Sequence, residues 1–203
     1  MAESAHQSKK PRTARGEKTR AKILEAARVE FGRNGFGETS IVGITTRAKV
    51  ALGTFYTYFD SKEELFSALV RDMSSRVGQA VAPALEEATG AIDAERRALA
   101  AFLDFAGDNA EVYRIIDEAE FVDPEGFRSH YEAIAARIME RLKAGENKGE
   151  ITATRDALQR EVRAWAIMGM NVFLGLRFSV WGKGDAAKVA ADANAMIAKG
   201  IER

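Results

Sequence analysis

Apolar side chains recur every three or four residues along most of this 203-residue chain, which is the spacing of one face of an α-helix. The alternation of apolar and polar positions that marks a half-buried strand is scarce. Beyond residue 60 the pattern predicts helices over residues 61–89, 93–109, 111–121, 124–143, 154–181 and 185–201, with Pro83 bending or ending the first and a polar loop at 145–149. The sequence therefore predicts an all-α fold.

Before residue 60 the same spacing predicts three short helices joined by tight turns. Asn34-Gly35 should end the first helix, and a break near Lys49-Val50 should separate the second from the third. Thr39 is the expected N-cap of the second helix. The side chains expected to face inward from the first two helices are Ile23, Leu24, Ala27, Phe31, Ile41, Ile44 and Ala48.

The third short helix contains four aromatic residues within five positions. Phe55 and Phe59 are four residues apart, so they share one helical face and are expected to pack into a core. Tyr56, Thr57 and Tyr58 carry hydroxyl groups, which suit contact with a phosphate backbone. One buried edge and one hydroxyl-rich edge are typical of a helix that docks on nucleic acid.

A capping box follows this helix. Ser61 and Glu64 have the spacing of an N-cap and its N3 partner, which predicts that a new helix begins there. Lys62, in the first turn of that helix, opposes the favoured sign for the helix dipole. We therefore expect an anion near Lys62, the alternative being a solvated lysine beside core aromatics.

The segment from about Glu17 to Leu69 resembles the DNA-binding domain of the tetracycline-repressor (TetR) family. The residues that carry the resemblance are Ile23-Leu24-Glu25-Ala26-Ala27, Phe31 to Phe36, Thr39-Ser40, Ile44, Ala48, Val50 and the run Gly53 to Leu65. It implies a basic arm over residues 1–15, a three-helix helix-turn-helix DNA-binding domain over 16–62, and a larger helical ligand-binding and dimerisation domain over 63–203. The DNA-contacting residues taken from this comparison are Arg15, Lys18, Thr39, Leu52, Gly53, Thr54, Tyr56, Thr57, Tyr58 and Lys62.

Several positions depart from the family pattern. Lys49 stands where a turn glycine is usual, and a non-glycine residue with positive φ is mildly costly. Ala51 stands where Ser or Thr usually caps the recognition helix, so that cap is missing. Leu52 and Val42-Gly43 replace residues that are usually polar, although an apolar side chain can still touch a thymine methyl group. These departures leave the fold unaffected and the base-reading contacts less defined.

Charge is distributed unevenly along the chain. Overall, 30 Lys/Arg and 30 Asp/Glu cancel, but residues 1–60 hold 11 basic and 6 acidic residues, a balance of +5. A basic N-terminal part on an acidic body favours binding to nucleic acid. The basic residues leading into the first helix either contact phosphates and the minor groove or form a solubilising tail. They are Lys9, Lys10, Arg12, Arg15, Lys18, Arg20 and Lys22.

Composition excludes several other classes. The chain has no cysteine, so it has neither a disulfide framework nor a thiolate metal site. No signal-peptide pattern appears, so a cytoplasmic location is expected. His6 lies in the tail and His130 stands alone on a helix, so neither a histidine triad nor a two-histidine metal site is expected. We therefore expect no enzyme activity, cofactor or metal, and interpret His130 as a satisfied histidine rather than a metal ligand with Glu118 or Glu132.

Residues 162–181 are apolar on nearly every side. Arg163 and Arg177 leave too short an apolar stretch for a membrane span, so protein must cover this helix on all sides. One apolar stripe is expected to face the chain's own core and comprises Leu158, Val162, Trp165, Gly169, Val172 and Leu176. The stripe assigned to a dimer interface comprises Ile167, Asn171, Leu174, Phe178 and Trp181, with Ile197 from the last helix. The family resemblance also implies a homodimer, whose two recognition helices read a palindrome in successive major grooves.

Members of the TetR family usually enclose a small molecule in the larger domain. Ten residues are candidates for that pocket, although singly each is at least as typical of an ordinary core: Phe102, Phe105, Tyr113, Ile116, Phe121, Phe127, Tyr131, Trp165, Met168 and Phe173. The stretch from Tyr113 to Tyr131 looks similar to family members that sense fatty acids or acyl thioesters, so a long apolar effector is the first expectation. Glu118 and Glu120 leave a cationic effector as the second.

The sequence thus predicts a homodimeric, ligand-responsive transcriptional regulator, expected to be a repressor released from a palindromic double-stranded operator by a small, largely apolar effector. No membrane partner is expected. One alternative is an activator or ligand-independent regulator, which promoter assays with and without the protein would distinguish. The other is a soluble carrier or enzyme that has lost DNA binding, which substitution of Tyr56 or Lys62 would leave unaffected.

Overall fold

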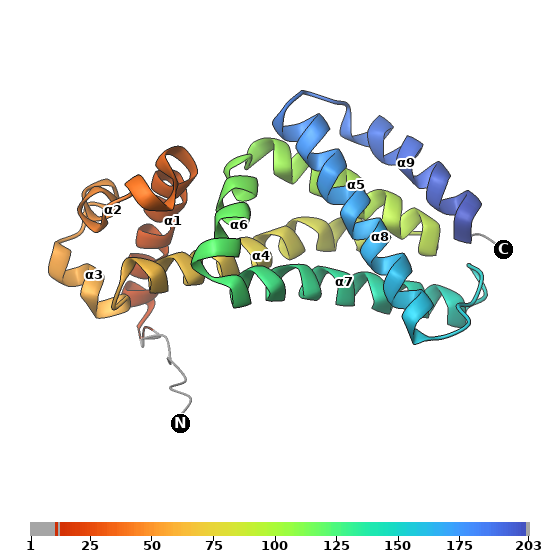
Figure 1. The fold of residues 1–203 in the computed structure, drawn as a ribbon, viewed down its shortest axis with the longest axis horizontal. Helices are drawn as coiled ribbons and strands as arrows, with labels where there is room; N and C mark the ends of the chain where they lie inside the picture. The colour runs from red at the N-terminus through yellow and green to blue at the C-terminus, as the bar shows by residue number, and fades with distance from the viewer. Residues whose placement is uncertain (1–10, 12, 202–203) are drawn as a thin grey trace. The chain divides into compact units, whose positions relative to one another are not determined.

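The structure, a computed structural model, describes residue 11 and residues 13–201. These residues form helices and no strand, which confirms the all-α prediction (Figure 1). The chain divides into two compact units, one of residues 1–72 with 111–127 and one of residues 73–110 with 128–203. Of the basic arm expected over residues 1–15, residues 1–10 and 12 lie outside the described part, and with them Lys9, Lys10 and Arg12.

The first unit is built on an aromatic core. Its helices are α1 (Ala14–Glu38), α2 (Ile41–Ala48), α3 (Leu52–Tyr58), the start of α4 (Lys62–Glu86), and α6 (Glu111–Val122). The rings of Phe31, Phe36 and Phe66 lie with centroids between 5.1 and 5.7 Å apart. Ile41 is half-buried, and the other residues expected to face inward are buried: Ile23, Leu24, Ala27, Phe31, Ile44, Ala48, Phe55 and Phe59.

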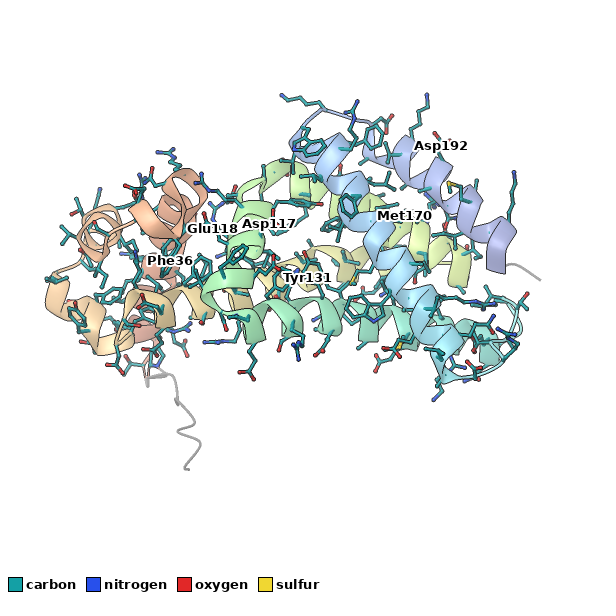
Figure 2. All side chains as sticks on the ribbon, in the orientation of Figure 1. Phe36, Asp117, Glu118, Tyr131, Met170 and Asp192 are labelled. Carbon is teal, nitrogen blue, oxygen red and sulfur yellow. The ribbon has the colours of Figure 1, made fainter. Side chains whose placement is uncertain are left out.

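Helix α6 packs against α1 within this unit. Gly35 breaks α1 as predicted, with φ of 79°, and a Cβ there would lie 2.6 Å from Glu118 Oε1. The Phe36 N–H donates a hydrogen bond to Glu118 Oε2 at 2.7 Å (Figure 2), and Arg114 Nη1 donates to the carbonyl of Arg33 at 2.9 Å. Residues 111–127 therefore belong to the same compact unit as the helix-turn-helix.

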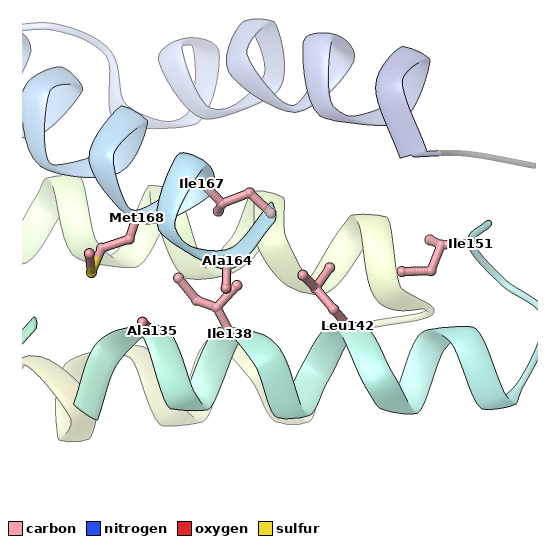
Figure 3. Close-up of a cluster of buried hydrophobic side chains, with 7 residues drawn as sticks. All are labelled: Ala135, Ile138, Leu142, Ile151, Ala164, Ile167 and Met168. Carbon is pink, nitrogen blue, oxygen red and sulfur yellow. The ribbon is translucent and has the colours of Figure 1, made fainter. Parts of the chain in front are cut away.

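Two apolar clusters are buried among the described residues of the second unit. Besides α4 from residue 73, it contains α5 (Ala91–Asp108), α7 (Pro124–Asn147) from residue 128, α8 (Ala157–Gly175), a π-helical turn (Leu176–Val180) and α9 (Ala186–Ile201). One cluster joins α7 to α8 and consists of Ala135, Ile138, Leu142, Ile151, Ala164, Ile167 and Met168 (Figure 3). The other joins α5 to α9 and consists of Leu99, Leu103, Ala190 and Ala193.

Helix α4 continues through Pro83 to Glu86, so this proline does not end the helix. The extents of α7 and α8 differ from the sequence prediction. Helix α7 continues through Gly145, because this glycine serves a close approach between helices: a Cβ there would lie 2.5 Å from the Cβ of Ala91. Helix α8 begins only after Asp156, whose side chain accepts a hydrogen bond from the Gln159 N–H at 2.8 Å, and a π-helical turn follows Gly175.

Candidate DNA-binding surface and ligand cavity

The turn between α2 and α3 has the geometry of a helix-turn-helix. Lys49 adopts the left-handed conformation, with φ of 55° and ψ of 46°, as expected where it replaces the usual glycine. Its N–H donates to the carbonyl of Thr46 at 3.2 Å, and the Val50 N–H donates to that of Thr45 at 3.1 Å. Ala51 gives α3 no side-chain cap, so the departure noted in the sequence is present in the structure.

Helix α3 has one face buried and one face open to solvent. Phe55 anchors it in the core, while Leu52, Gly53, Tyr56 and Thr57 are exposed. A Cβ built on Gly53 would meet no atom within 4 Å, so another body can approach the backbone closely there.

The other candidates for DNA contact fall into two groups. Thr54 and Tyr58 on α3 are half-buried, whereas Arg15 and Lys18 in the first turns of α1 are exposed. Thr13 caps this end of α1, its Oγ1 accepting a hydrogen bond from the Gly16 N–H at 3.1 Å. The two exposed basic side chains, Arg15 and Lys18, therefore belong to the capped first turns of a regular helix.

Thr39 does not occupy the predicted position. It is buried, and its Oγ1 donates to the carbonyl of Gly35 at 2.7 Å. The N-cap of α2 is Ser40, whose Oγ accepts a hydrogen bond from the Gly43 N–H at 3.0 Å. Two adjacent hydroxyl residues could serve as the cap, and Ser40 does so because the Thr39 side chain is buried and bonded to Gly35.

The hydrogen-bond partners of Lys62 are backbone carbonyl groups of the protein, whereas an anion was expected near this side chain. Its Nζ donates to the carbonyl oxygens of Phe36 at 2.8 Å and Thr39 at 2.9 Å and stands 4.3 Å from the centre of the Phe36 ring. The negative partner of this lysine is thus the carbonyl end of α1. The capping box beside it is formed, because the Glu64 N–H donates to Ser61 Oγ at 3.1 Å while Glu64 Oε2 accepts from the Asp60 N–H at 2.6 Å.

The sequence model for "Bacterial regulatory proteins, tetR family" matches residues 23–69, the segment that contains this helix-turn-helix. The HTH-type transcriptional regulator YdgC of Bacillus subtilis is 28% identical over 195 residues, covering 93% of this chain and 95% of YdgC. The chain belongs to the TetR family. It is a transcriptional regulator with a DNA-binding helix-turn-helix domain.

Two further relatives extend the comparison beyond the TetR-family helix-turn-helix. The HTH-type transcriptional repressor SCO4008 of Streptomyces coelicolor is 27% identical over 143 residues, which cover 67% of this chain and 69% of the repressor. The solved structure of the fatty acid degradation regulator FadR from Bacillus halodurans superposes with a TM-score of 0.76 at 17% sequence identity, covering 93% of this chain and 96% of FadR. This likeness shows that the two proteins share a fold.

The second unit of this TetR-family protein contains a cavity of about 710 Å³, lined by α4, α5, α7 and α8. Cavities of this size hold small organic molecules. The wall is mostly apolar and includes Val77, Val81, Leu85, Phe102, Ile134, Ile138, Met168 and Val172. The polar side chains on it are Ser75, Gln79, Arg137, Glu140, Arg141 and Asn171. The Oδ1 atom of Asn171 is buried with no hydrogen-bond partner among the described residues.

Only two of the ten pocket candidates, Phe102 and Met168, line this cavity. Phe121 and Phe173 are 83% and 71% exposed, because both lie on outward faces of their helices. Trp165 is also exposed, and Tyr131 packs beside the α7–α8 cluster. Ile116 is buried within the first unit, to which Tyr113, Phe121 and Phe127 also belong, and Phe105 is half-buried on α5.

Burial along α8 differs from the two apolar stripes assigned from the sequence, although Val172 of the stripe expected to face the core does pack against the α7–α8 cluster. Ile167 is buried against α7, and Asn171 lines the cavity. Of the six residues assigned to a dimer interface, only Trp181 is exposed, because Leu174 packs against the α5–α9 cluster, Ile197 packs against the α7–α8 cluster and Phe178 is half-buried. The residues open to solvent are instead Leu158, Val162, Trp165 and Phe173, with Met196 on α9.

Sequence reasoning missed the charged residues around the cavity. Glu95 is buried, and its carboxylate accepts two hydrogen bonds from Arg141, at 2.6 Å from Nε and 2.9 Å from Nη2. A carboxylate within the apolar stripe of Ile92, Ala98 and Leu99 was the available signal, because charged residues are rarely buried without a partner.

No group of three His, Cys, Asp or Glu side chains in residues 13–201 is arranged to hold a metal ion. His130 is buried, and a hydrogen bond of 2.5 Å joins its Nδ1 to Ser74 Oγ. None of the helices over that range combines the length and apolar character that crossing a membrane requires.

Proposed function

We propose that this TetR-family protein is a homodimeric repressor that leaves a palindromic operator when a small, largely apolar molecule occupies the cavity in its second unit. The observation that carries this proposal is the continuity of α4. Its first turns bury Leu65, Phe66 and Leu69 in the helix-turn-helix unit, and its later turns line the cavity with Val81 and Leu85.

A ligand that favours one position of α4 would therefore favour one position of the recognition helix. The ligand can act only through a difference in its affinity for the two positions. The names of two relatives are in accord with this role, since SCO4008 is described as a transcriptional repressor and FadR as a fatty acid degradation regulator. A regulator of this kind would act on DNA in the bacterial cytosol.

The surface proposed to read DNA is the exposed face of α3, with Leu52, Gly53, Tyr56 and Thr57. Short recognition helices enter the major groove, where the backbone at Gly53 could approach base edges closely. Arg15 and Lys18 are proposed to contact phosphates, which would make the operator affinity fall with rising salt concentration.

Substituting Gly53 by aspartate is expected to weaken operator binding at least about 100-fold, because a carboxylate would face the DNA phosphates. The fold should survive, since a side chain at Gly53 meets open space and a carboxylate in the first turn of a helix is favourable. The measurement is fluorescence anisotropy of labelled DNA from upstream of the gene, at two salt concentrations.

Gly200→Asp is the matched control. A Cβ there also meets no atom within 4 Å, and the charge change is the same, but the site lies in the second unit. Equal loss of affinity in the two variants would argue against α3 as the reading surface. Wild-type protein that binds DNA only weakly and without sequence preference would favour the carrier alternative.

The homodimer is proposed to form through the exposed apolar face of α8 and α9. Phe173→Asp places a charge on that face and is expected to raise the dimer dissociation constant at least about 100-fold. Sedimentation equilibrium at micromolar concentration measures this. Phe121→Asp makes the same change at a phenylalanine that is 83% exposed in the first unit, and that variant should remain dimeric. A dimeric Phe173→Asp protein would require a different interface.

The remaining alternative is an activator or a ligand-independent regulator. A promoter fused to a reporter, assayed with and without the protein, distinguishes it from a repressor. Adding long-chain acyl compounds to the protein–DNA complex then tests ligand response, and operator affinity that ignores a saturating effector would contradict it.

A further inference from the structure

The guanidinium of Arg137 lies across the cavity wall from α7 to α4. A Cβ on Gly78 of α4 would be 3.0 Å from Nη1, 3.4 Å from Cζ and 3.6 Å from Nη2 of Arg137. Glycine is disfavoured in the interior of a helix, and here its missing side chain makes room for the guanidinium. Arg137 and Gly78 both line the cavity. The guanidinium of Arg137 therefore lies at the cavity wall, against α4.

Arg137 is exposed to solvent, and its positive charge is not neutralised by an ion pair with any described residue. Arg141, one turn further along α7, is neutralised by its two hydrogen bonds to Glu95. No carboxylate in residues 13–201 forms an ion pair with Arg137. Burial, and after it the charge of Arg137, lowers the pKa of His130 to about 4. Glu140, which is also exposed, lines the cavity as well, so the head-group comparison below must distinguish the two side chains.

We propose that the cavity binds an amphipathic anion, with a carboxylate or phosphate group held by Arg137 over Gly78 and a hydrocarbon chain along the apolar wall near Phe102 and Met168. The planar guanidinium can donate two parallel hydrogen bonds to such an oxyanion. This inference rests on the proposed function to the extent that it names the chemical class of the effector.

The test compares head groups on one alkyl chain by isothermal titration calorimetry, with full-length protein and no DNA. Decanoate and decyl phosphate should each bind about tenfold more tightly than decanol, and decylammonium should bind more weakly than decanol. From octanoate to dodecanoate the affinity should rise about fourfold for each added methylene group until the apolar space is full. The tighter binder of decanoate and decyl phosphate identifies whether the natural head group is a carboxylate or a phosphate.

Arg137→Gln should remove the preference for the anion and leave the affinity for decanol unchanged, a pattern that general damage to the fold would not produce. Gly78→Ala should weaken decanoate binding severalfold by displacing the guanidinium, again without affecting decanol. Lys143→Gln is the matched control, since it removes an exposed positive charge from the same helix away from the cavity.

Three results would overturn the inference: equal affinities for decanoate and decanol, tightest binding of decylammonium, or no binding of any of these compounds. Tightest binding of decylammonium would indicate that Glu140, and not Arg137, binds the head group. Anion binding that depends on Arg137 but leaves the operator complex intact would support the inference and contradict only the proposed ligand response. The two proposals therefore fail separately.

Discussion

Replacing Glu95 by alanine is expected to lower the free energy of unfolding by about 3 kcal/mol. The carboxylate of Glu95 is buried and joins α5 to α7 through two hydrogen bonds from Arg141. Its removal would leave a partly buried guanidinium in the cavity wall without a counter-charge. Urea unfolding followed by circular dichroism, at one fixed protein concentration, measures the change.

Two further variants show whether the ion pair itself accounts for that loss. The double variant Glu95→Leu with Arg141→Met should recover most of the stability, because packed apolar side chains can replace a buried ion pair. Glu87→Ala removes an exposed carboxylate that pairs with Arg97 at 2.9 Å and should leave stability nearly unchanged. If Glu95→Ala were no more harmful than Glu87→Ala, the buried pair would contribute nothing measurable.

Lowering the pH from 6.5 to 4 is expected to cost about 3 kcal/mol of stability through His130 alone. Burial first, and then the charge of Arg137, lowers the pKa of this imidazole from 6.5 to about 4 in the folded protein. Between these values the unfolded chain binds a proton that the folded protein does not, so stability falls as the pH falls. The free energy of unfolding measured at closely spaced pH values between 7 and 4 tests this.

His130→Gln keeps the side chain polar and uncharged at every pH. Its stability should therefore lack this component of the decline below pH 6.5, although carboxylates continue to titrate. The chain has one other histidine, His6, and His6→Gln measures its contribution separately. Parallel pH profiles for wild type and His130→Gln would contradict the assignment.

The helix-turn-helix could be recognised from sequence because its signals are local. The four-residue spacing of Phe55 and Phe59 was enough to predict their burial, which the structure confirms, and the capping box at Ser61 and Glu64 marked the start of α4. Lys49 showed a positive φ at the position where a glycine is usual. Each of these features depends on residues within a few positions of one another.

Other features depended on partners far along the chain. The attachment of α6 to the first unit includes a hydrogen bond between Phe36 and Glu118, 82 residues apart, for which neither segment carries a sequence signal. Lys62 was expected beside an anion because its helix position suggested one, yet carbonyl oxygens more than 20 residues earlier provide the partner. The choice of Ser40 over Thr39 as N-cap likewise followed from the burial of Thr39.

The sequence by itself determined that this protein is all-helical, that its N-terminal part is a helix-turn-helix and which side of α3 faces the core, because helical periodicity, caps and turns are local properties of the chain. Only the tertiary structure decided which apolar stripe of α8 is buried and which charged side chains line the cavity. Both stripes satisfy the same helical periodicity, so the sequence does not distinguish them. Glu95 pairs with Arg141, and Arg137 comes to line the cavity, only when α4, α5 and α7 pack together.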